Sequence, residues 1–365
     1  MRHRFHSLCP YFAMFPESFA EQWIERLTRK GDVVLDPFSG RGTTAFQSLL
    51  MGRRAVACDV NDVAFCLTKA KTCAPQLPVV LRRITTLAKG FDARQWTSRV
   101  DNCSEFFHVA FARRALQQLL YLRATLRWKS SNVDAMVAAL VLGSLHGEMD
   151  KSKAYLSNQM PRTISTKPAY SLRFWKERAL TPPERDVFAL LRQRARFRYE
   201  SAPPSGTAVV IHGDMRELPW PRIQLPDRIG CVITSPPYFD VTNFEEDQWL
   251  RLWFLGGPPF PTRGRVSTDD RYSYEAKYWE FIADMWRCLG AVLSRRAHIV
   301  IRIGCRRLSP DHLRLALTAA SRFSRRRIEL IGSEVSRIRN RQTDLFRPGA
   351  RGCSVELDCH YHFLN

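Results

Sequence analysis

Two short stretches combine residue types that could bind a ligand and position a reactive group. The first, residues 36–44 with the sequence DPFSGRGTT, follows an apolar run at 32–36 and precedes a stretch that favours a helix. Glycines let a backbone approach a ligand closely, and the first turn of a helix offers unpaired N–H groups to an anion. A phosphate-binding loop is excluded, because no lysine follows Gly42 and the carboxylate of Asp36 would repel phosphate.

The residues of this turn suit a ligand that carries an ammonium, a carboxylate and a ribose. Asp36 can accept the ammonium, and Asp59, at the end of the next apolar run, can accept the ribose hydroxyls. The backbone amides at Gly40 and Gly42, together with Thr43, can hold the carboxylate. S-adenosylmethionine carries all three groups, so the turn predicts it as the cofactor; an ordinary tight turn is the alternative.

The second stretch is residues 234–238, with the sequence TSPPY, which follows the apolar run 230–233. It is therefore expected at the carboxyl end of a strand, where α/β proteins bind ligands. Two consecutive prolines remove backbone donors and leave acceptors, namely the Ser235 hydroxyl and the Pro236 carbonyl. Tyr238 adds an aromatic face on which a planar group can stack.

Such a setting suits the exocyclic amine of a nucleobase. The nitrogen lone pair is delocalised into the ring, so the amine is a poor nucleophile; two acceptors can draw its hydrogens while an aromatic side chain holds the extruded base. Positioning against an electrophilic methyl group then suffices, with no metal and no covalent intermediate. A loop stiffened by proline after a strand is the alternative.

The elements that must position these stretches read as an α/β fold. A strand, a glycine turn, a helix and a strand ending in an acid form the first half of a doubly wound domain. We expect one such domain, interrupted by a basic, aromatic helical insertion. The predicted catalytic domain comprises 1–65 and 206–365, and the insertion comprises 66–205. Further strands are expected at 207–212, 228–234 and 298–303, and a final antiparallel pair at 327–334 and 354–362.

The composition favours an intracellular protein that binds nucleic acid. A formal net charge of +21 and a sequence pI near 10.0 indicate a polyanionic partner. The ten cysteines form no C-x-x-C pair, which is typical of buried thiols in a reducing compartment. A cluster of Cys353, Cys359, His360 and His362 matches no common zinc spacing, so we expect no metal. We see no membrane span or secretory signal and expect a cytoplasmic, nucleoid-associated protein.

The two motifs in this order resemble the signatures of the N4-cytosine/N6-adenine DNA methyltransferase family. Further segments at 6–17, 59–61, 212–216 and 247–253 fit the same family, and the resemblance covers about 1–65 and 206–305. It implies a Rossmann-like, seven-stranded methyltransferase sheet with a helical insertion, and methyl transfer from S-adenosylmethionine to a flipped base. A serine at the first catalytic position is associated mainly with N4 of cytosine.

The resemblance also implies which residues form the site. The catalytic residues would be Ser235, Pro236, Pro237 and Tyr238. The cofactor would be bound by Phe15, Asp36, Phe38, Gly40, Gly42, Thr43, Asp59, Asn61 and Asp214.

An insertion in this position suits recognition of double-stranded DNA, because Lys and Arg can contact phosphates while amides read base edges. The candidates are Lys151, Lys153, Asn158, Gln159 and Arg162 in the insertion, and Arg263 and Arg265 in the basic loop that follows the catalytic helix. Methylation of adenine N6 and of an RNA base remain alternative activities, and a nucleic-acid-binding protein on an inactive scaffold is the alternative without catalysis. The sequence leaves open the target site, the oligomeric state and whether a companion restriction enzyme exists.

Overall fold

The computed structural model divides the chain into two compact units, each described here by itself. The sheet unit comprises 13–68, 204–243 and 264–365, and the helical unit comprises 1–12, 69–203 and 244–263. The residues that the structure describes are 2–11, 15–149, 152, 154–161, 166–220, 223–225, 228–239, 244–262, 274–305, 307–337, 353 and 355–364, with the backbone alone at 244–246 and 337.

The helical unit is larger than the expected insertion, because residues 1–12 and 244–263 join it through long-range hydrogen bonds. Arg198 donates to the Arg4 carbonyl at 3.1 Å and to the Ser7 hydroxyl at 2.7 Å. Arg123 donates to the carbonyl of Trp253 at 2.7 Å and to that of Gly257 at 3.0 Å. The segment after the catalytic motif thus packs with the helices, which no local sequence pattern indicated.

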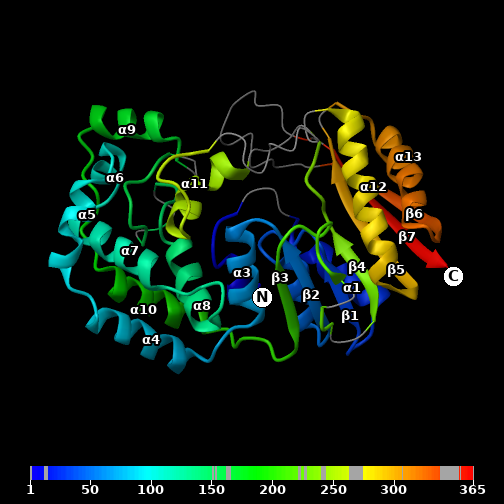
Figure 1. The fold of residues 1–365 in the computed structure, drawn as a ribbon, viewed down its shortest axis with the longest axis horizontal. Helices are drawn as coiled ribbons and strands as arrows, with labels where there is room; N and C mark the ends of the chain where they lie inside the picture. The colour runs from blue at the N-terminus through cyan, green and yellow to red at the C-terminus, as the bar shows by residue number, and fades with distance from the viewer. Residues whose placement is uncertain are drawn as a thin grey trace. The chain divides into compact units, whose positions relative to one another are not determined.

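The sheet unit is built on seven strands in the order β3-β2-β1-β4-β5-β7-β6 (Figure 1). β1 to β5 run parallel, whereas β7 is antiparallel to both β5 and β6. The expected seven-stranded sheet and its final antiparallel pair are therefore confirmed. The strands are β1 (Val33–Asp36), β2 (Arg54–Asp59), β3 (Ala208–His212), β4 (Ile229–Thr234), β5 (Leu293–Gly304), β6 (Arg327–Arg337) and β7 (Val355–Leu364).

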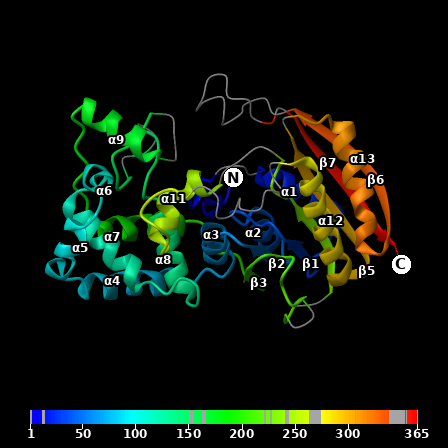
Figure 2. The same ribbon diagram turned by 45° about the horizontal axis from the view of Figure 1, so that its top comes forward.

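Helices cover both faces of this sheet (Figures 1 and 2). The side chains of β1 alternate between two apolar cores. Val33 and Leu35 pack in the cluster that contains α12 (Glu275–Val292) and α13 (Pro310–Ala320). Val34 packs on the other face, with α1 (Glu17–Leu27). Because all four β1 residues are buried, the strand reads as one continuous apolar run ending in an acid.

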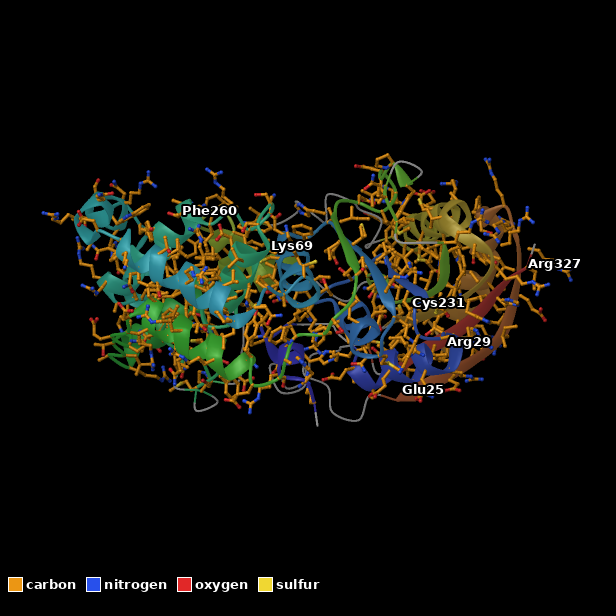
Figure 3. All side chains as sticks on the ribbon, turned by 90° about the horizontal axis from the view of Figure 1, so that it is seen from below. Glu25, Arg29, Lys69, Cys231, Phe260 and Arg327 are labelled. Atoms are coloured by element: carbon orange, nitrogen blue, oxygen red, sulfur yellow. The ribbon has the colours of Figure 1, made fainter. Side chains whose placement is uncertain are left out.

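Two further helices complete the sheet unit near the glycine turn: α2 (Thr43–Leu50) packs on β2, and α3 (Asp62–Thr72) begins just after β2. Cys231 lies within β4 and is buried, whereas Arg327 lies on the outermost strand β6 and is exposed (Figure 3). The glycine turn therefore follows β1, which is one of the inner strands of the sheet.

The helical unit surrounds one apolar helix, α8 (Asn132–Leu142), whose residues from Asp134 onward are all buried. Its end meets the first residues of the chain so closely that a Cβ at Gly143 would lie 2.2 Å from the Leu8 carbonyl oxygen. In the described residues no helix is both long and apolar enough to cross a bilayer. The other helices are α4 (Leu77–Lys89), α5 (Thr97–Asp101), α6 (Glu105–Ala110), α7 (Arg113–Thr125), α9 (Pro168–Glu177), α10 (Val187–Arg198) and α11 (Phe244–Phe254).

Candidate active site

A hydrogen bond between side chains joins the two motifs. The Thr234 hydroxyl, at the end of β4, donates to Asp36 Oδ1, at the end of β1, over 2.7 Å. The two strands are parallel neighbours in the sheet, so their carboxyl ends meet at the same edge. Thr44 adds a second link by donating its hydroxyl to the Ile233 carbonyl at 3.1 Å. The glycine turn and the TSPPY loop therefore emerge side by side.

Asp36 is a buried carboxylate with one oxygen to spare. Its Oδ1 accepts from Thr234 and from the Phe38 amide, at 3.2 Å, while Oδ2 is buried and has no hydrogen-bond partner among the described residues. Burial raises the pKa of Asp36 from 3.8 to about 7, and the hydrogen bond from Thr234 opposes this only in part. An unsatisfied buried carboxylate oxygen is costly unless a cation or a donor meets it. The site thus favours a positively charged donor.

The glycine turn adopts a backbone conformation that glycine readily allows. Gly40 and Gly42 have φ angles of 50° and 70°, in the left-handed region, and Gly42 is the residue that precedes α2. A Cβ at Gly42 would lie 2.6 Å from Thr68 Oγ1, on α3. The Thr68 hydroxyl donates to the Gly40 carbonyl at 3.2 Å, so a hydrogen bond from α3 stabilises the turn. Sequence reasoning missed Thr68, which no motif marks.

Asp59 fixes the shape of the same turn from the end of β2. Its Oδ2 accepts from the Gly40 amide at 2.8 Å, and its Oδ1 accepts from the Asn61 amide at 2.9 Å. Burial raises the pKa of Asp59 to about 6, and these backbone hydrogen bonds partly offset the effect. A carboxylate oxygen can accept a second hydrogen bond, so capacity for ribose hydroxyls remains.

Two of the expected cofactor residues have structural tasks of their own. The Asn61 side-chain oxygen caps α3, accepting from the Val63 amide at 2.9 Å and the Ala64 amide at 3.3 Å. Asp214 forms a two-point pair with Arg216, whose Nε donates to Oδ1 at 2.8 Å and whose Nη2 contacts Oδ2. Any role of these side chains toward a ligand would share atoms with these bonds.

The remaining expected cofactor residues are Phe15, Phe38 and Thr43, and each makes contacts of its own within the protein. Phe15 is 9% exposed and packs edge to face on Phe19 at 4.9 Å between ring centres. Phe38 packs against Phe281 of α12 at 5.5 Å. The Thr43 hydroxyl is buried and accepts from Arg41 Nε at 3.3 Å. Their contacts to a ligand stay predictions.

The TSPPY loop is held at two points within the sheet unit. Tyr278 of α12 donates its hydroxyl to the Pro237 carbonyl at 2.9 Å. The Tyr238 hydroxyl donates to Glu356 Oε1, on β7, at 2.8 Å. Burial raises the pKa of Tyr238 well above its usual range, the Glu356 carboxylate adds to this, and a hydrogen bond with Ser235 opposes it. The phenol is therefore protonated and donating at neutral pH.

Of the two residues expected to supply acceptors, Ser235 is half-buried and Pro236 is buried. Sequence reasoning missed Tyr278 and Glu356, because both reach the loop from elements far away in the chain. A partial signal was Gly304, which ends the apolar run of β5: a Cβ there would lie 2.8 Å from the Tyr238 ring.

The predicted DNA-contacting residues are only partly described. Asn158 is 6% exposed, and its side-chain amide donates to the carbonyls of Val109 at 2.7 Å and Leu180 at 3.2 Å. The structure therefore does not favour Asn158 as a base-reading residue, because its donors stabilise the interior of the helical unit. Gln159 is half-buried and donates to the Ser152 carbonyl at 2.8 Å. Lys151, Lys153, Arg162, Arg263 and Arg265 lie outside the described residues.

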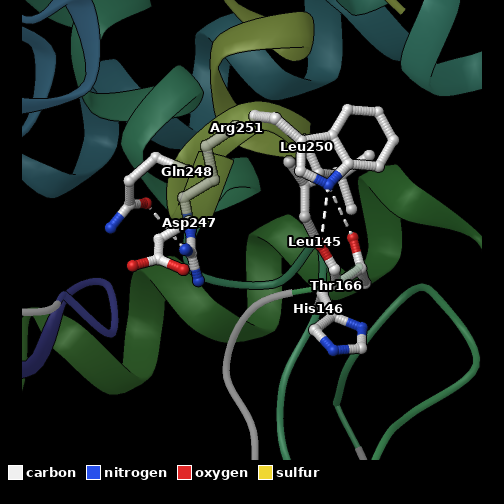
Figure 4. Close-up of a pocket in the computed structure, with 8 residues that line it drawn as sticks. Leu145, His146, Thr166, Asp247, Gln248, Leu250 and Arg251 are labelled. Atoms are coloured by element: carbon white, nitrogen blue, oxygen red, sulfur yellow. Dashed lines mark hydrogen bonds between the residues drawn. The ribbon is translucent and has the colours of Figure 1, made fainter. Parts of the chain in front are cut away.

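A small cavity lies inside the helical unit, beside α11 (Figure 4). Burial, followed by the nearby Arg251, lowers the pKa of His146 to about 3, so this imidazole is neutral. The cavity has room for about one water molecule and is too small for a nucleoside cofactor. Its lining residues are Leu145, His146, Thr166, Asp247, Gln248, Trp249, Leu250 and Arg251.

Three histidines of β5 and β7 contact one another. His298 Nδ1 lies 3.1 Å from His360 Nε2, and the His298 ring stacks on His362 at 4.7 Å between ring centres. Across the described part of the chain, no three His, Cys, Asp or Glu side chains are placed to share a metal ion.

Comparisons with known proteins match parts of the chain. A family model for N6 and N4 methyltransferases, described as DNA methylase, matches residues 3–69. The type II methyltransferase M.MjaII of Methanocaldococcus jannaschii is 30% identical over 66 residues, which are 18% of this chain and 12% of that protein. The orphan methyltransferase M.BamHII of Bacillus amyloliquefaciens is 41% identical over 49 residues, 13% of this chain and 18% of that protein.

The chain thus spans less than a fifth of the length of these curated relatives. Among solved structures, TrmN from Thermus thermophilus aligns with 99% of this chain and 52% of its own chain, at 10% identity and a TM-score of 0.39. That similarity is too low to bear on function.

Proposed function

We propose that this chain, which belongs through residues 3–69 to the DNA methylase family of N6 and N4 methyltransferases, is an S-adenosylmethionine-dependent DNA methyltransferase. We propose further that it methylates the exocyclic amine of a flipped base, N4 of cytosine in preference to N6 of adenine. The observation that carries the proposal is the 2.7 Å hydrogen bond from Thr234 to Asp36, which joins a nucleoside-binding turn to an amine-binding loop.

The residues of the turn fit S-adenosylmethionine. The spare Oδ2 of Asp36 suits the ammonium group, since a cation would offset the burial that raises the pKa of this carboxyl. The glycines at 40 and 42 allow the left-handed turn, and Asp59 lies beside this turn for the ribose hydroxyls. When bound, the cofactor supplies an electrophilic methyl group on a sulfonium.

The residues of the loop fit the exocyclic amine of a nucleobase. This amine is a poor nucleophile, so it has to be positioned for methyl transfer. Ser235 and the Pro236 carbonyl would accept its two hydrogens, and the Tyr238 ring would stack on the base. Because positioning is their contribution, these residues act by holding the amine in line with the methyl group. The preference for cytosine rests on the resemblance at Ser235, since hydroxyl chemistry alone does not select the base.

Double-stranded DNA is the proposed substrate, and the helical unit is the proposed region of target recognition. The net charge of +21 supports a polyanionic partner, because lysines and arginines release the counterions that condense on DNA. The basic, aromatic texture of residues 150–200 supports the same assignment.

The test is to incubate the full chain with tritiated S-adenosylmethionine in two separate reactions. One reaction contains unmethylated genomic DNA, and the other contains total RNA. Amplified DNA from a bacterial genome samples many candidate sites, so the target need not be known. We expect label in DNA, recovered after nucleoside digestion as N4-methylcytosine. Label in N6-methyladenine would overturn the base assignment, and label in RNA alone would overturn the substrate. Ser235→Ala is the matched control for transfer that depends on the loop.

A further inference from the structure

The aromatic ring of the TSPPY loop is fastened from the far edge of the sheet. We propose that Glu356 of β7 is a positioning residue that holds the Tyr238 ring as a preformed stacking surface for the flipped base. This proposal rests on the proposed function and adds a residue that lies outside both motifs.

The Tyr238 side chain is fixed at two places. Its hydroxyl donates to Glu356 Oε1 at 2.8 Å, and its ring lies against the backbone of Gly304, where a Cβ would come within 2.8 Å of Cε2 and 3.0 Å of Cδ2. The hydroxyl bond restrains the far end of the ring, and the glycine allows the near edge to settle on β5. Together these contacts leave little freedom for the ring to swing.

Glu356 is itself held rigidly. Its Oε2 lies 3.3 Å from Arg302 Nη1, and Arg302 binds Asp358 through two bonds, Nε to Oδ1 at 2.6 Å and Nη2 to Oδ2 at 2.7 Å. Arg302 is 7% exposed, and its guanidinium lies 3.9 Å above the ring of Phe19. A planar guanidinium anchored on three sides is a firm support for the carboxylate.

Strand register explains why these groups meet. Gly304 pairs with Glu356 and Arg302 pairs with Asp358 in the antiparallel β5–β7 ladder. Side chains two residues apart lie on the same face of a strand, so both carboxylates flank the one guanidinium. Two carboxylates around one cation leave a net negative charge, which makes Glu356 a strong acceptor for a phenol.

A preformed surface matters for binding an extruded base. A tyrosine ring that had to be ordered at the moment of binding would cost affinity, whereas a ring already held avoids that cost. The alternative is a purely structural role, in which Glu356 only stabilises the sheet. The two ideas differ in one respect: a stabilising role would not depend on the Tyr238 hydroxyl.

The experiment is a double-mutant cycle with Tyr238→Phe and Glu356→Ala. The first variant keeps the ring and removes the donor, and the second removes the acceptor. We expect each to lower kcat/KM for DNA about tenfold, as loss of a charge-assisted hydrogen bond would, with an unchanged cofactor dissociation constant. The double variant should be no worse than either single variant. Glu356→Gln, which keeps a carbonyl acceptor, should restore most of the activity.

Glu329→Ala is the matched control, because Glu329 is an exposed glutamate on the neighbouring β6. Full activity of Glu356→Ala, or losses that multiply in the double variant, would overturn the proposal. If Glu356→Ala fails to fold, the tyrosine resonance described next, which uses Glu356→Gln, decides the question instead.

A second measurement needs no activity. In protein labelled with [ζ-13C]tyrosine, the Tyr238 resonance, identified by its loss in Tyr238→Phe, should shift in Glu356→Gln and stay in place in Glu329→Ala. An unshifted resonance would overturn the positioning role. If the wild-type protein transfers no methyl group to DNA, the proposed function falls, while this spectrum still decides whether Glu356 holds the phenol.

Discussion

Replacing Asp36 with asparagine should make the protein more stable and less able to bind its cofactor. The change keeps the shape of the side chain and an oxygen that accepts from Thr234, but it removes the charge from a site that is 1% exposed. Burial raises the pKa of Asp36 from 3.8 to about 7. The folded protein therefore carries an ionised carboxylate above pH 7 at a cost in stability.

The size of the effect follows from linkage. One pKa unit corresponds to about 1.4 kcal/mol, so the difference between 3.8 and about 7 corresponds to roughly 4 kcal/mol at pH 8. The asparagine brings a buried NH2 with no acceptor, which costs about 1–3 kcal/mol. We expect a net gain of about 1–3 kcal/mol in the free energy of unfolding at pH 8. The gain should shrink as the pH falls from 7 toward 3.8, because the wild-type carboxyl becomes protonated.

The assay pairs urea denaturation with isothermal titration of S-adenosylmethionine. Asp36→Asn should weaken cofactor binding by at least about tenfold, as loss of a charged partner does, and should flatten its dependence on pH between 6 and 8. Asp311→Asn, at a carboxylate with 78% of its side chain exposed, is the control for loss of a charge. A variant that is destabilised at pH 8, or that binds the cofactor as the wild type does, would refute this account of Asp36.

Three further outcomes are expected. Ser235→Ala should lower turnover about fivefold, as loss of one hydrogen bond would, with an unchanged cofactor dissociation constant in titration; unchanged turnover at saturating DNA would count against the loop's role. Gly42→Ala should lower both the melting temperature and cofactor affinity, because its φ is 70° and its Cβ would meet Thr68 at 2.6 Å; a neutral variant would contradict the strained turn. Burial, followed by His298, lowers the pKa of His360 to about 4. The contribution of His360 to the free energy of unfolding should therefore decline as the pH falls from 6.5 toward 4, and His360→Gln should remove that contribution when its denaturation curves are compared with those of the wild type at each pH.

The frame of the site was predictable because its signals are local. Residues 33–50 encode a buried strand, a glycine turn and a helix in continuous order, and each step depends on neighbours in sequence. TSPPY follows an apolar strand, so its place at the carboxyl edge of the sheet followed from the alternation of strand and turn. The two predictions together, one for residues 33–50 and one for TSPPY, imply that Thr234 and Asp36 lie at the same edge of the sheet.

The rest depends on contacts between distant residues. Nothing near Glu356 in the sequence indicates that it meets Tyr238, because that meeting requires the register between β5 and β7. Asn61 was expected to bind the cofactor, yet its side-chain oxygen caps α3. The sequence does not distinguish the two roles, because an asparagine at this position suits either of them. Residues 244–254 follow the catalytic loop in sequence but pack with the helical unit, since Arg251 donates to the Leu142 carbonyl.

The position of β7 has a consequence for how the protein matures. This strand lies between β5 and β6, although it follows both in the chain and therefore leaves the ribosome after them. Until residues 355–364 emerge, β5 has a bare edge and β6 has no partner, and such edges are prone to pair with other chains. The acceptor for the Tyr238 hydroxyl arrives with the same strand. A nascent chain can therefore form its glycine turn early, but it completes the anchored tyrosine only after β7 has been inserted.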